Sequence, residues 1–333
     1  MIHTLTPEQI ELAARALLGA LTTDDQQPTH LQVAVIEAVA RGVQGVDLDC
    51  AALEPIGLDG LGDLDPTPAE AHQIVQDAIS LELLLHPLPR SVERSVERFA
   101  AALGVDHHLI DATRDLAHGH LALMQADIER NSWYTTQTVK GILHGHLWEL
   151  ARSKSAYLGA PEDKAIARRW ESLADHGPGT LGRSVADFYE AHHFPFPGER
   201  HGIYELGAHH DFVHVLADYT TSPEGEIDVF AFIAATMTDP KGFALFAFTL
   251  GLFQNASITR VSGKKVAIAR ADTLDDPGAV DRYADALRRA TSCTVDVMGG
   301  IDHFALADRP LDQLRAEFHI LPKGVPGPGY LEN

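Results

Sequence analysis

The sequence predicts a mainly helical, all-α protein made of two packed helical regions, with at most a minor pair of strands. Apolar residues recur every three or four positions through most of the chain, as they do on one face of an α-helix. Hydroxyl and proline signals typical of helix starts precede several of these stretches. Strands and helices do not alternate as they would in a parallel sheet. The 333 residues, 45% of them hydrophobic, suffice for two domains.

The N-terminal region, residues 1–130, is predicted to be a small acidic helical bundle. Thr6, Pro7 and Glu8 open its first helix with a hydroxyl cap, a proline in the first turn and an early acid. Residues 45–66, rich in Gly, Asp and Pro, are predicted to form a long loop. The expected helices cover 7–21, 31–43, 68–85, 90–103 and 106–128.

The C-terminal region, residues 131–333, follows a soft boundary at Asn131-Ser132-Trp133 and is predicted to be a helical metal-binding domain. The segment from Val266 to Ala269 is the one candidate for a brief strand. The expected helices lie near 135–157, 162–175, 181–193, 203–219, 223–237, 242–255, 278–290 and 310–318.

The chain is strongly and unevenly acidic, with 47 acidic and 26 basic residues and a formal charge of −21. Residues 1–130 hold 21 acidic residues, 7 arginines and no lysine, which nets 7 − 21 = −14. Such a surface repels nucleic-acid phosphates and anionic lipid headgroups. We therefore expect no nucleic-acid partner and at most peripheral contact with a membrane.

The cysteine and hydropathy patterns favour a soluble cytoplasmic protein. Cys50 and Cys293 are far apart and fit neither a disulfide framework nor a thiolate metal site, so a reducing compartment is expected. The start lacks a basic region followed by an apolar run, and no stretch reaches 18 apolar residues. Any membrane association would be peripheral, at the inner face.

The segment with the clearest chemistry is Ala208-His-His-Asp-Phe-Val-His214. On a helix, His210 and His214 lie one turn apart and Asp211 falls on the same arc. The neighbours of these residues are apolar, which predicts that the helix is buried. Buried imidazoles and carboxylates need partners. Either a metal ion satisfies all three groups, or the two histidines simply bond to Asp211.

A fourth ligand is available shortly after this helix. Ser222 and Pro223 are typical of a helix start and place Glu226 just inside the next helix. An antiparallel return would bring Glu226 back beside His210 and His214. Two histidines, one aspartate and one glutamate suit zinc, with manganese and iron as alternatives because all three accept imidazole and carboxylate ligands.

The spacing His210-Asp211-x-x-His214-x11-Glu226 resembles the H-D-x-x-H-x11-E metal motif of the ubiquinone (coenzyme Q) biosynthesis family usually called Coq-four. The similarity extends over about 165–321. Three further segments resemble those of the family: Gly179-Thr-Leu-Gly182 with Ala186-Asp-Phe188 upstream, Gly225-Glu226 before an apolar helix, and Leu311-x-x-Leu-Arg-x-Glu-x-x-Ile320 near the end.

The resemblance implies an all-α fold, a zinc-type metal held by His210, Asp211, His214 and Glu226, and a role in quinone biosynthesis. The substrate would be a prenylated aromatic acid, and the reaction a lyase-type oxidative removal of the ring carboxylate at C1. Within this set we assign His210 and Asp211 to the catalytic role. The other quinone-biosynthesis enzymes would be partners.

The sequence departs from the family in two places. Gly299-Gly-Ile-Asp-His-Phe304 replaces a segment that the family often has rich in tryptophan and glutamate. Residues 1–130 have no counterpart in the family. They are loosely similar to the acidic bundles of the tellurite-resistance (TerB-like) group, without that group's repeated Asp-Gly-Glu signatures.

Several alternatives stay open. Four protein ligands can close a zinc site, as in a prenyl-lipid-binding scaffold with a structural metal. A phosphohydrolase of the His-Asp type would need another histidine, such as His176 or His193, at the same ion. A zinc protease would have glutamate in place of Asp211. The apolar stretch 242–253 could line a prenyl channel, form a buried core helix or serve as a homodimer face.

Overall fold

The computed structural model describes residues 5–144, 156–159, 161–261, 264–265 and 270–332. This part of the chain is mainly helical, and its one sheet has two antiparallel strands. In the sheet, β1 (Arg260–Val261) pairs with β2 (Lys264–Lys265). The all-α prediction with a minor strand pair is therefore confirmed. The brief strand expected at 266–269 lies outside the described residues.

The N-terminal helices begin where the sequence signals place them. Thr6, Thr29 and Thr67 each accept a hydrogen bond from the backbone of the third helical residue, whose side chain bonds back to the cap. The helices of this region are α1 (Pro7–Leu21), α2 (His30–Gln44), α3 (Pro68–Glu82), α4 (Arg90–Ala102), α5 (Ile110–Ala117) and α6 (Leu121–Arg130).

Two details of the N-terminal region differ from expectation. The single helix expected over 106–128 is wrong, because the chain breaks into α5 and α6 at Gly119, whose φ of +76° lies in the left-handed region that glycine tolerates. The loop over 45–66 contains two short 3-10 helices, Cys50–Ala52 and Leu58–Asp63. Leu61 from the second of these is buried in the bundle.

The C-terminal helices match the expected order, with shorter bounds at several ends. The helix expected over 135–157 begins as α7, and residues 145–155 lie outside the described part. The helices are α7 (Trp133–Leu143), α9 (Lys164–Glu171), α10 (Leu181–Ala191), α11 (Glu205–Ala217), α12 (Pro223–Thr236), α13 (Phe243–Phe253), α14 (Ala279–Ser292) and α15 (Leu311–Glu317). Three 3-10 turns accompany them: Ser172–Asp175, Pro240–Gly242 and Thr273–Asp275.

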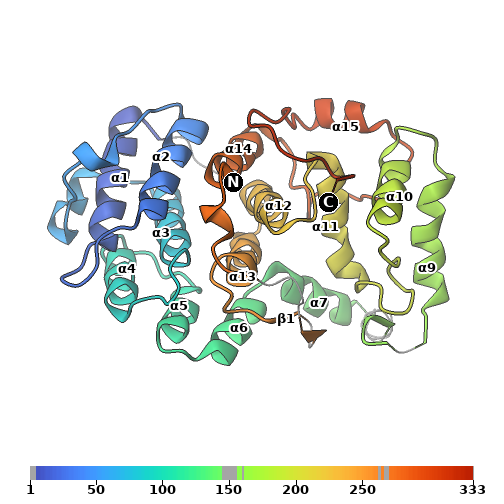
Figure 1. The fold of residues 1–333 in the computed structure, drawn as a ribbon, viewed down its shortest axis with the longest axis horizontal. Coiled ribbons are helices and arrows are strands. Elements are labelled where there is room, and N and C mark those ends of the chain that lie inside the picture. The colour runs from blue at the N-terminus through green and yellow to red at the C-terminus, as the bar shows by residue number, and fades with distance from the viewer. Residues whose placement is uncertain (1–4, 145–155, 160, 262–263, 266–269, 333) are drawn as a thin grey trace.

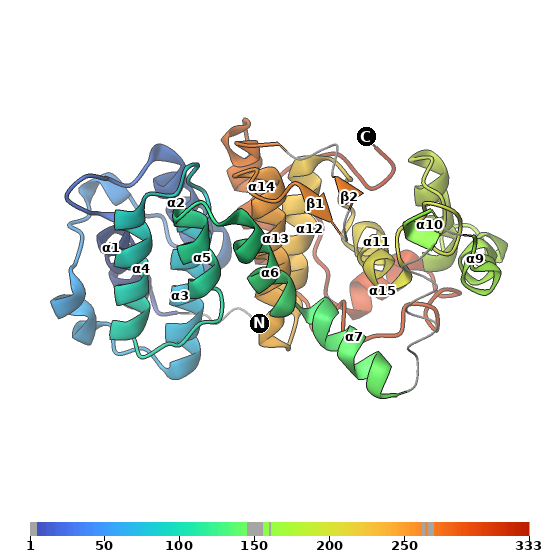
Figure 2. The same cartoon turned by 90° about the horizontal axis from the view of Figure 1, so that it is seen from below.

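The helices are arranged along one long axis (Figure 1). Helices α1–α5 form one end, α12–α14 the middle, and α9–α11 the other end, as the view from below also shows (Figure 2). The two regions pack directly on each other, because α2 lies against α14 and α6 lies against α13. Gly42 permits the close approach of α2: a Cβ there would lie 3.3 Å from the Cβ of Ala284.

The middle of the molecule is its most apolar part. Most residues of α12 and α13 are buried, and Ile227, Phe232 and Leu250 have no exposed surface. The 242–253 stretch is thus a buried core helix. Among the described residues, no helix combines the length and apolarity needed to cross a bilayer. This apolar middle holds α12 beside α11, and these two helices carry the candidate site.

Candidate metal centre

Helices α11 and α12 bring the four candidate ligands together. Helix α11 ends at Asp218, which adopts a left-handed conformation with φ 61° and turns the chain back. Ser222 then caps α12 by accepting a hydrogen bond from the backbone N–H of Gly225, and Pro223 occupies the first turn. Glu226 follows within that first turn. The local sequence signals therefore set where this carboxylate returns.

The ligand atoms of the four side chains lie close to one another. One atom each from His210, Asp211 and His214 lies within 4.8 Å of the other two. His210 Nε2 is 3.3 Å from Asp211 Oδ1. Glu226 meets the two histidines through different oxygens, with Oε1 3.4 Å from His214 Nε2 and Oε2 4.0 Å from His210 Nε2. The structure thus gathers all four residues that the sequence singled out.

Both imidazoles are oriented by backbone carbonyls. His210 Nδ1 lies 2.6 Å from the carbonyl oxygen of Gly207, and His214 Nδ1 lies 3.1 Å from that of Tyr219. A carbonyl only accepts, so each Nδ1 carries the proton and donates it. In a neutral imidazole this leaves the lone pair on Nε2, which faces the cluster. Metal-bound histidines in proteins are usually held in this way.

Asp211 is oriented by a tyrosine from a different helix. The Tyr189 hydroxyl on α10 donates a 2.5 Å hydrogen bond to Asp211 Oδ2, so that Oδ1 faces His210. Tyr189 is 1% exposed, and burial together with the Asp211 charge raises its pKa well above the ordinary value. The hydroxyl therefore stays protonated and remains a donor.

Within the described ranges, no lysine or arginine forms an ion pair with the four side chains. His214 is fully buried, and its Nε2 has no hydrogen-bond partner among the described residues. Burial lowers the pKa of His214, yet the charges of Glu226 and Asp211 outweigh this and leave the pKa raised. Burial likewise raises the pKa of Glu226, but the two histidines leave it lowered. Both shifts arise from the attraction between the imidazoles and the carboxylates in this buried cluster.

The residues present fit a metal ion. Ligand atoms about 2.0–2.2 Å from zinc at tetrahedral angles would be separated by about 3.3–3.6 Å. The His210–Asp211 and His214–Glu226 separations are 3.3 and 3.4 Å. Two neutral imidazoles and two carboxylates carry a net charge of −2, which a divalent cation balances. These two separations and the charge balance suit a metal site, while the third separation, 4.0 Å between His210 Nε2 and Glu226 Oε2, is longer. The 3.4 Å contact between His214 and Glu226 is also compatible with the alternative of a paired histidine and carboxylate.

The cluster opens on a large cavity. Its volume is about 550 Å³, and His210 and Glu226 form part of its wall. These two side chains are 12% and 14% exposed, whereas that of His214 behind them is fully buried. An ion held by the cluster would therefore be reached from the cavity, past His210 and Glu226.

The cavity is mainly apolar, with some polar groups in its lining. Phe230 of α12 stacks on the ring of His210 at 5.2 Å. Helix α13 contributes apolar side chains, and the hairpin contributes Lys264, whose ammonium lies 3.8 Å from the ring centre of Tyr157. The lining residues from α7, α13, β2 and the N-cap of α11 include Tyr134, Tyr204, Leu245, Phe248, Leu252 and Lys264. The 242–253 stretch is thus both a core helix and a cavity wall.

Helix α10 and the stretch near the end of the chain also pack close to the cluster. Gly182, in the first turn of α10, lies so close to Ala307 that a Cβ there would lie 2.9 Å from the carbonyl oxygen of Ala307. Helix α10 then supplies Tyr189, and also Phe188, which stacks on His214 at 5.7 Å. Near the end of the chain, the guanidinium of Arg315 donates to the carbonyl oxygens of residues 215 and 216 at 2.9 and 3.0 Å. These hydrogen bonds give partners to carbonyl oxygens in the last turn of α11, which have none within the helix.

Tyr189, which orients Asp211, could not be predicted from the sequence. Tyr189 precedes Asp211 by 22 positions and no local pattern links the two. Conversely, neither His176 nor His193 joins the cluster in the described part of the chain. His209 turns away from it toward His303, with 3.3 Å between their Nδ1 atoms. The mutually close set is His210, Asp211 and His214, and Glu226 adjoins it through its contacts with the two histidines.

Comparisons with protein-family models, curated proteins and solved structures found no match for this chain.

Proposed function

We propose that the protein binds one divalent metal ion through His210, Asp211, His214 and Glu226 and uses it to hold the head group of a prenylated aromatic acid. Zinc fits the ligands best, with manganese or iron as alternatives. The observation that carries this proposal is the partly exposed His210–Glu226 edge of the cluster, which forms part of the wall of a mainly apolar cavity.

The cavity suits a ligand with a charged head and an apolar tail. Its volume of about 550 Å³ falls in the range of small-molecule sites, roughly 300–1,000 Å³. The head would face the ion beside His210, where Phe230 offers an aromatic surface. The side chains of Leu245, Phe248 and Leu252 line the cavity and would cover a prenyl chain. A polar ligand such as a phosphate ester or a peptide would leave these apolar walls unused.

A divalent ion would act as a Lewis acid toward a carboxylate or phenolate oxygen. The protein's own contribution is to hold that oxygen beside Asp211 and His210 and to keep water away with apolar walls. In the enzymatic version the ring carboxylate leaves as carbon dioxide and a hydroxyl takes its place. That exchange consumes one dioxygen, two electrons and two protons, releases one water, and needs an external two-electron reductant.

The main alternative is a scaffold that binds the prenyl lipid around a structural metal. Four protein side chains can complete a tetrahedral metal site without a further ligand, and this favours the structural version. The exposed edge at His210 and Glu226 favours the catalytic version. A His-Asp phosphohydrolase is the less suitable reading, since no further histidine joins the three-residue cluster within the described ranges.

Binding and turnover can be tested in one experiment. Zinc-, manganese- and iron-loaded protein is titrated with a 4-hydroxybenzoate that carries a short prenyl chain, and release of its labelled carboxylate is followed with dioxygen and a reductant present. Metal-dependent binding with carbon dioxide release supports the enzyme, and binding without release supports the scaffold. If no metal form binds this acid, the proposed function is wrong.

Two variants sharpen the result. Leu252→Trp should fill the cavity and weaken binding of the prenylated acid at least about ten-fold without loss of metal, because the added ring occupies the space for the tail. Leu123→Trp, at an exposed position of α6, is the matched control and should change neither quantity. Equal ligand binding by both variants would place the prenylated acid outside this cavity.

A further inference from the structure

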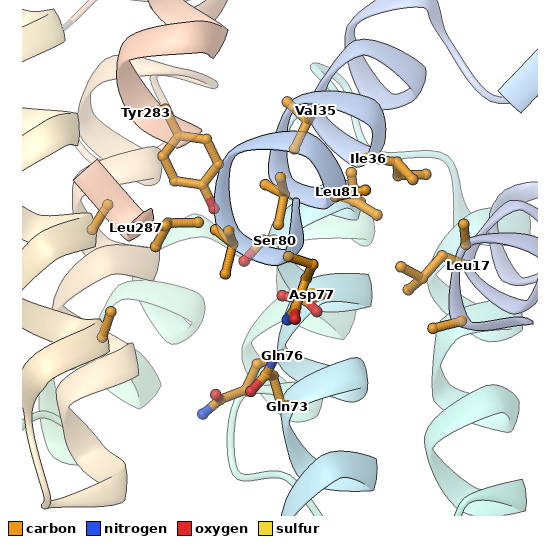
Figure 3. A pocket seen from close by; sticks show the side chains of 18 of the residues that line it. Leu17, Val35, Ile36, Gln73, Gln76, Asp77, Ser80, Leu81, Tyr283 and Leu287 are labelled. Atoms are coloured by element: carbon orange, nitrogen blue, oxygen red, sulfur yellow. The ribbon is translucent and has the colours of Figure 1, made fainter. Parts of the chain in front are cut away.

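A second cavity lies between the two helical regions, in a place that the proposed function does not use. Its volume is about 140 Å³, and α1, α2 and α3 face α12, α13 and α14 across it (Figure 3). Helix α13 separates the two cavities: its Phe243 and Phe246 line this one, whereas its Leu245 and Phe248 line the one at the metal cluster. The two spaces are therefore on different faces of the same helix.

The walls of this cavity are mainly apolar, and the polar side chains on them are Gln44, Gln73, Gln76, Asp77, Ser80 and Tyr283. The apolar residues include Leu17 from α1, Val35 and Ile36 from α2, Leu81 from α3 and Leu287 from α14. Apolar cavities of about 150 Å³ accommodate a molecule the size of benzene. The space is thus large enough for one aromatic ring or a short branched alkyl group.

One carboxylate points into this apolar space. Asp77 of α3 lies at its centre, with Ser80 one turn further along the helix and the Tyr283 hydroxyl directed toward them from α14 (Figure 3). No hydrogen bond or ion pair joins the Asp77 carboxylate to any described residue. Asp77 and Tyr283 are the only titratable groups among the described lining residues. No side-chain cation therefore compensates Asp77 in the cavity.

An unpaired carboxylate among apolar walls is costly. Burial raises the pKa of Asp77 to about 7. The surrounding region adds to the negative potential, since residues 1–130 net 7 − 21 = −14. A strongly acidic surface raises the local concentration of small cations. Both the missing partner and the field of the region favour a positively charged ligand.

We propose that this cavity binds a small organic ammonium ion, whose charged group pairs with Asp77 and whose apolar body, about the size of a benzene ring, fills the space between α2 and α14. The ammonium can donate to the Asp77 carboxylate and to the Ser80 hydroxyl, while Tyr283 closes the α14 side. Inorganic cations do not use the apolar walls, and neutral or anionic aromatics do not use the carboxylate. This site is independent of the metal cluster.

Three probes of one shape test the assignment. Benzylammonium, benzyl alcohol and benzoate are each titrated into the full chain at pH 8 by calorimetry and by chemical-shift changes. Benzylammonium should bind at least about ten-fold more tightly than benzyl alcohol, as expected for a charge pair in an apolar site, and benzoate should not bind. Equal affinity for the amine and the alcohol, or no saturable binding of the amine, overturns the proposal.

Variants locate the binding. Asp77→Asn removes the charge and keeps the shape, so it should reduce benzylammonium affinity to that of benzyl alcohol. Asp59→Asn makes the same change at an exposed position and should leave the affinity unchanged. Ala234→Leu should abolish binding by filling the cavity. Unchanged affinity in Asp77→Asn would contradict the proposal, and thermal unfolding at pH 8 shows whether each variant is folded.

Two further readouts separate this site from the metal centre. His214→Ala should lose metal and retain benzylammonium binding. Lowering the pH from 8 to 5.5 should weaken benzylammonium binding by about ten-fold or more, because Asp77 takes up a proton in that interval and Tyr283 stays neutral throughout. A pH-independent affinity, or loss of amine binding in His214→Ala with the fold intact, would show that the amine does not pair with Asp77.

Discussion

The hydroxyl of Tyr189 decides how Asp211 faces the metal cluster. Its hydrogen bond occupies Oδ2 and leaves Oδ1 for a cation. The carbonyl oxygens of Gly207 and Tyr219 do the same for the two histidines. The i, i+4 spacing of the histidines could be read from the sequence, because it follows from helix geometry. The groups that orient the ligands could not be read from the sequence, since they come from another helix and from the backbone.

Tyr189→Phe should therefore weaken metal binding while the protein stays folded. The loss of one partner to a metal ligand typically lowers affinity about 10–100-fold. Competition with a chelator measures the affinity of the purified variant. Tyr283→Phe, which removes a buried hydroxyl far from the cluster, is the control and should bind the metal as the native chain does. Similar affinity in both variants would mean that Tyr189 does not position Asp211.

Buried histidines should make the fold sensitive to acid. Burial lowers the pKa of His303 to about 3, and His303 is 1% exposed. The unfolded chain binds the proton near pH 6.5 and the folded chain only near 3, so stability is complete above 6.5 and falls as the pH drops between these values. The loss is up to about 1.4 kcal/mol per pH unit for one histidine.

Denaturant unfolding of the native chain and of His303→Gln, measured from pH 7 to pH 4, tests this effect. The variant should lose less stability across that range than the native chain does. His30→Gln, at an exposed position, should keep the native slope. Parallel slopes for all three proteins would show that His303 does not resist protonation in the folded state.

At the scale of single elements, the turn between α11 and α12 sets the position of Glu226. Ser222 and Pro223 identify this helix start in the sequence, and the structure has α12 begin there. Other helix boundaries were harder to predict from the sequence. The apolar pattern of 106–128 runs through Gly119, and only the left-handed backbone at that glycine separates α5 from α6. A periodic pattern shows a helical face, but it does not show an interruption.

Gly225→Ala should disturb the same turn. A Cβ at position 225 would lie 2.1 Å from the carbonyl oxygen of Thr220, so the start of α12 must shift. We expect a loss of stability of about 1–3 kcal/mol and weaker metal binding because Glu226 moves with the helix. Chemical denaturation and metal titration measure the two effects.

Gly62→Ala is the matched control, since a Cβ at that position would meet nothing within 4 Å. It should leave metal affinity unchanged. If Gly225→Ala binds the metal as tightly as Gly62→Ala, the position of α12 does not determine the site.

At the scale of the whole molecule, the most pronounced feature is the negative net charge. The all-α class followed from periodicity and the charge from composition, so both were available from the sequence. The sequence did not reveal the packing of α2 on α14 or the two cavities beside α13. They depend on which helix faces meet across long stretches of chain, and an apolar helix such as α13 carries no signal that distinguishes its faces.

A formal charge of −21 should make the fold more stable as salt is added. Screening shortens the range of repulsion between surface carboxylates, from about 30 Å at 0.01 M to about 8 Å at 0.15 M ionic strength. We expect Tm to rise by several degrees between those concentrations, equally in sodium and potassium chloride. A Tm that stays constant or falls would mean that repulsion does not limit the fold.

The most direct test of the central claim is the metal content of the purified protein. Elemental analysis after zinc loading and removal of excess ion should find one equivalent in the native chain. It should find much less in His214→Ala and Glu226→Ala, although both still unfold cooperatively. A native protein without a stoichiometric ion, or variants that retain it in full, would contradict the account of α11 and α12 as two halves of one metal centre.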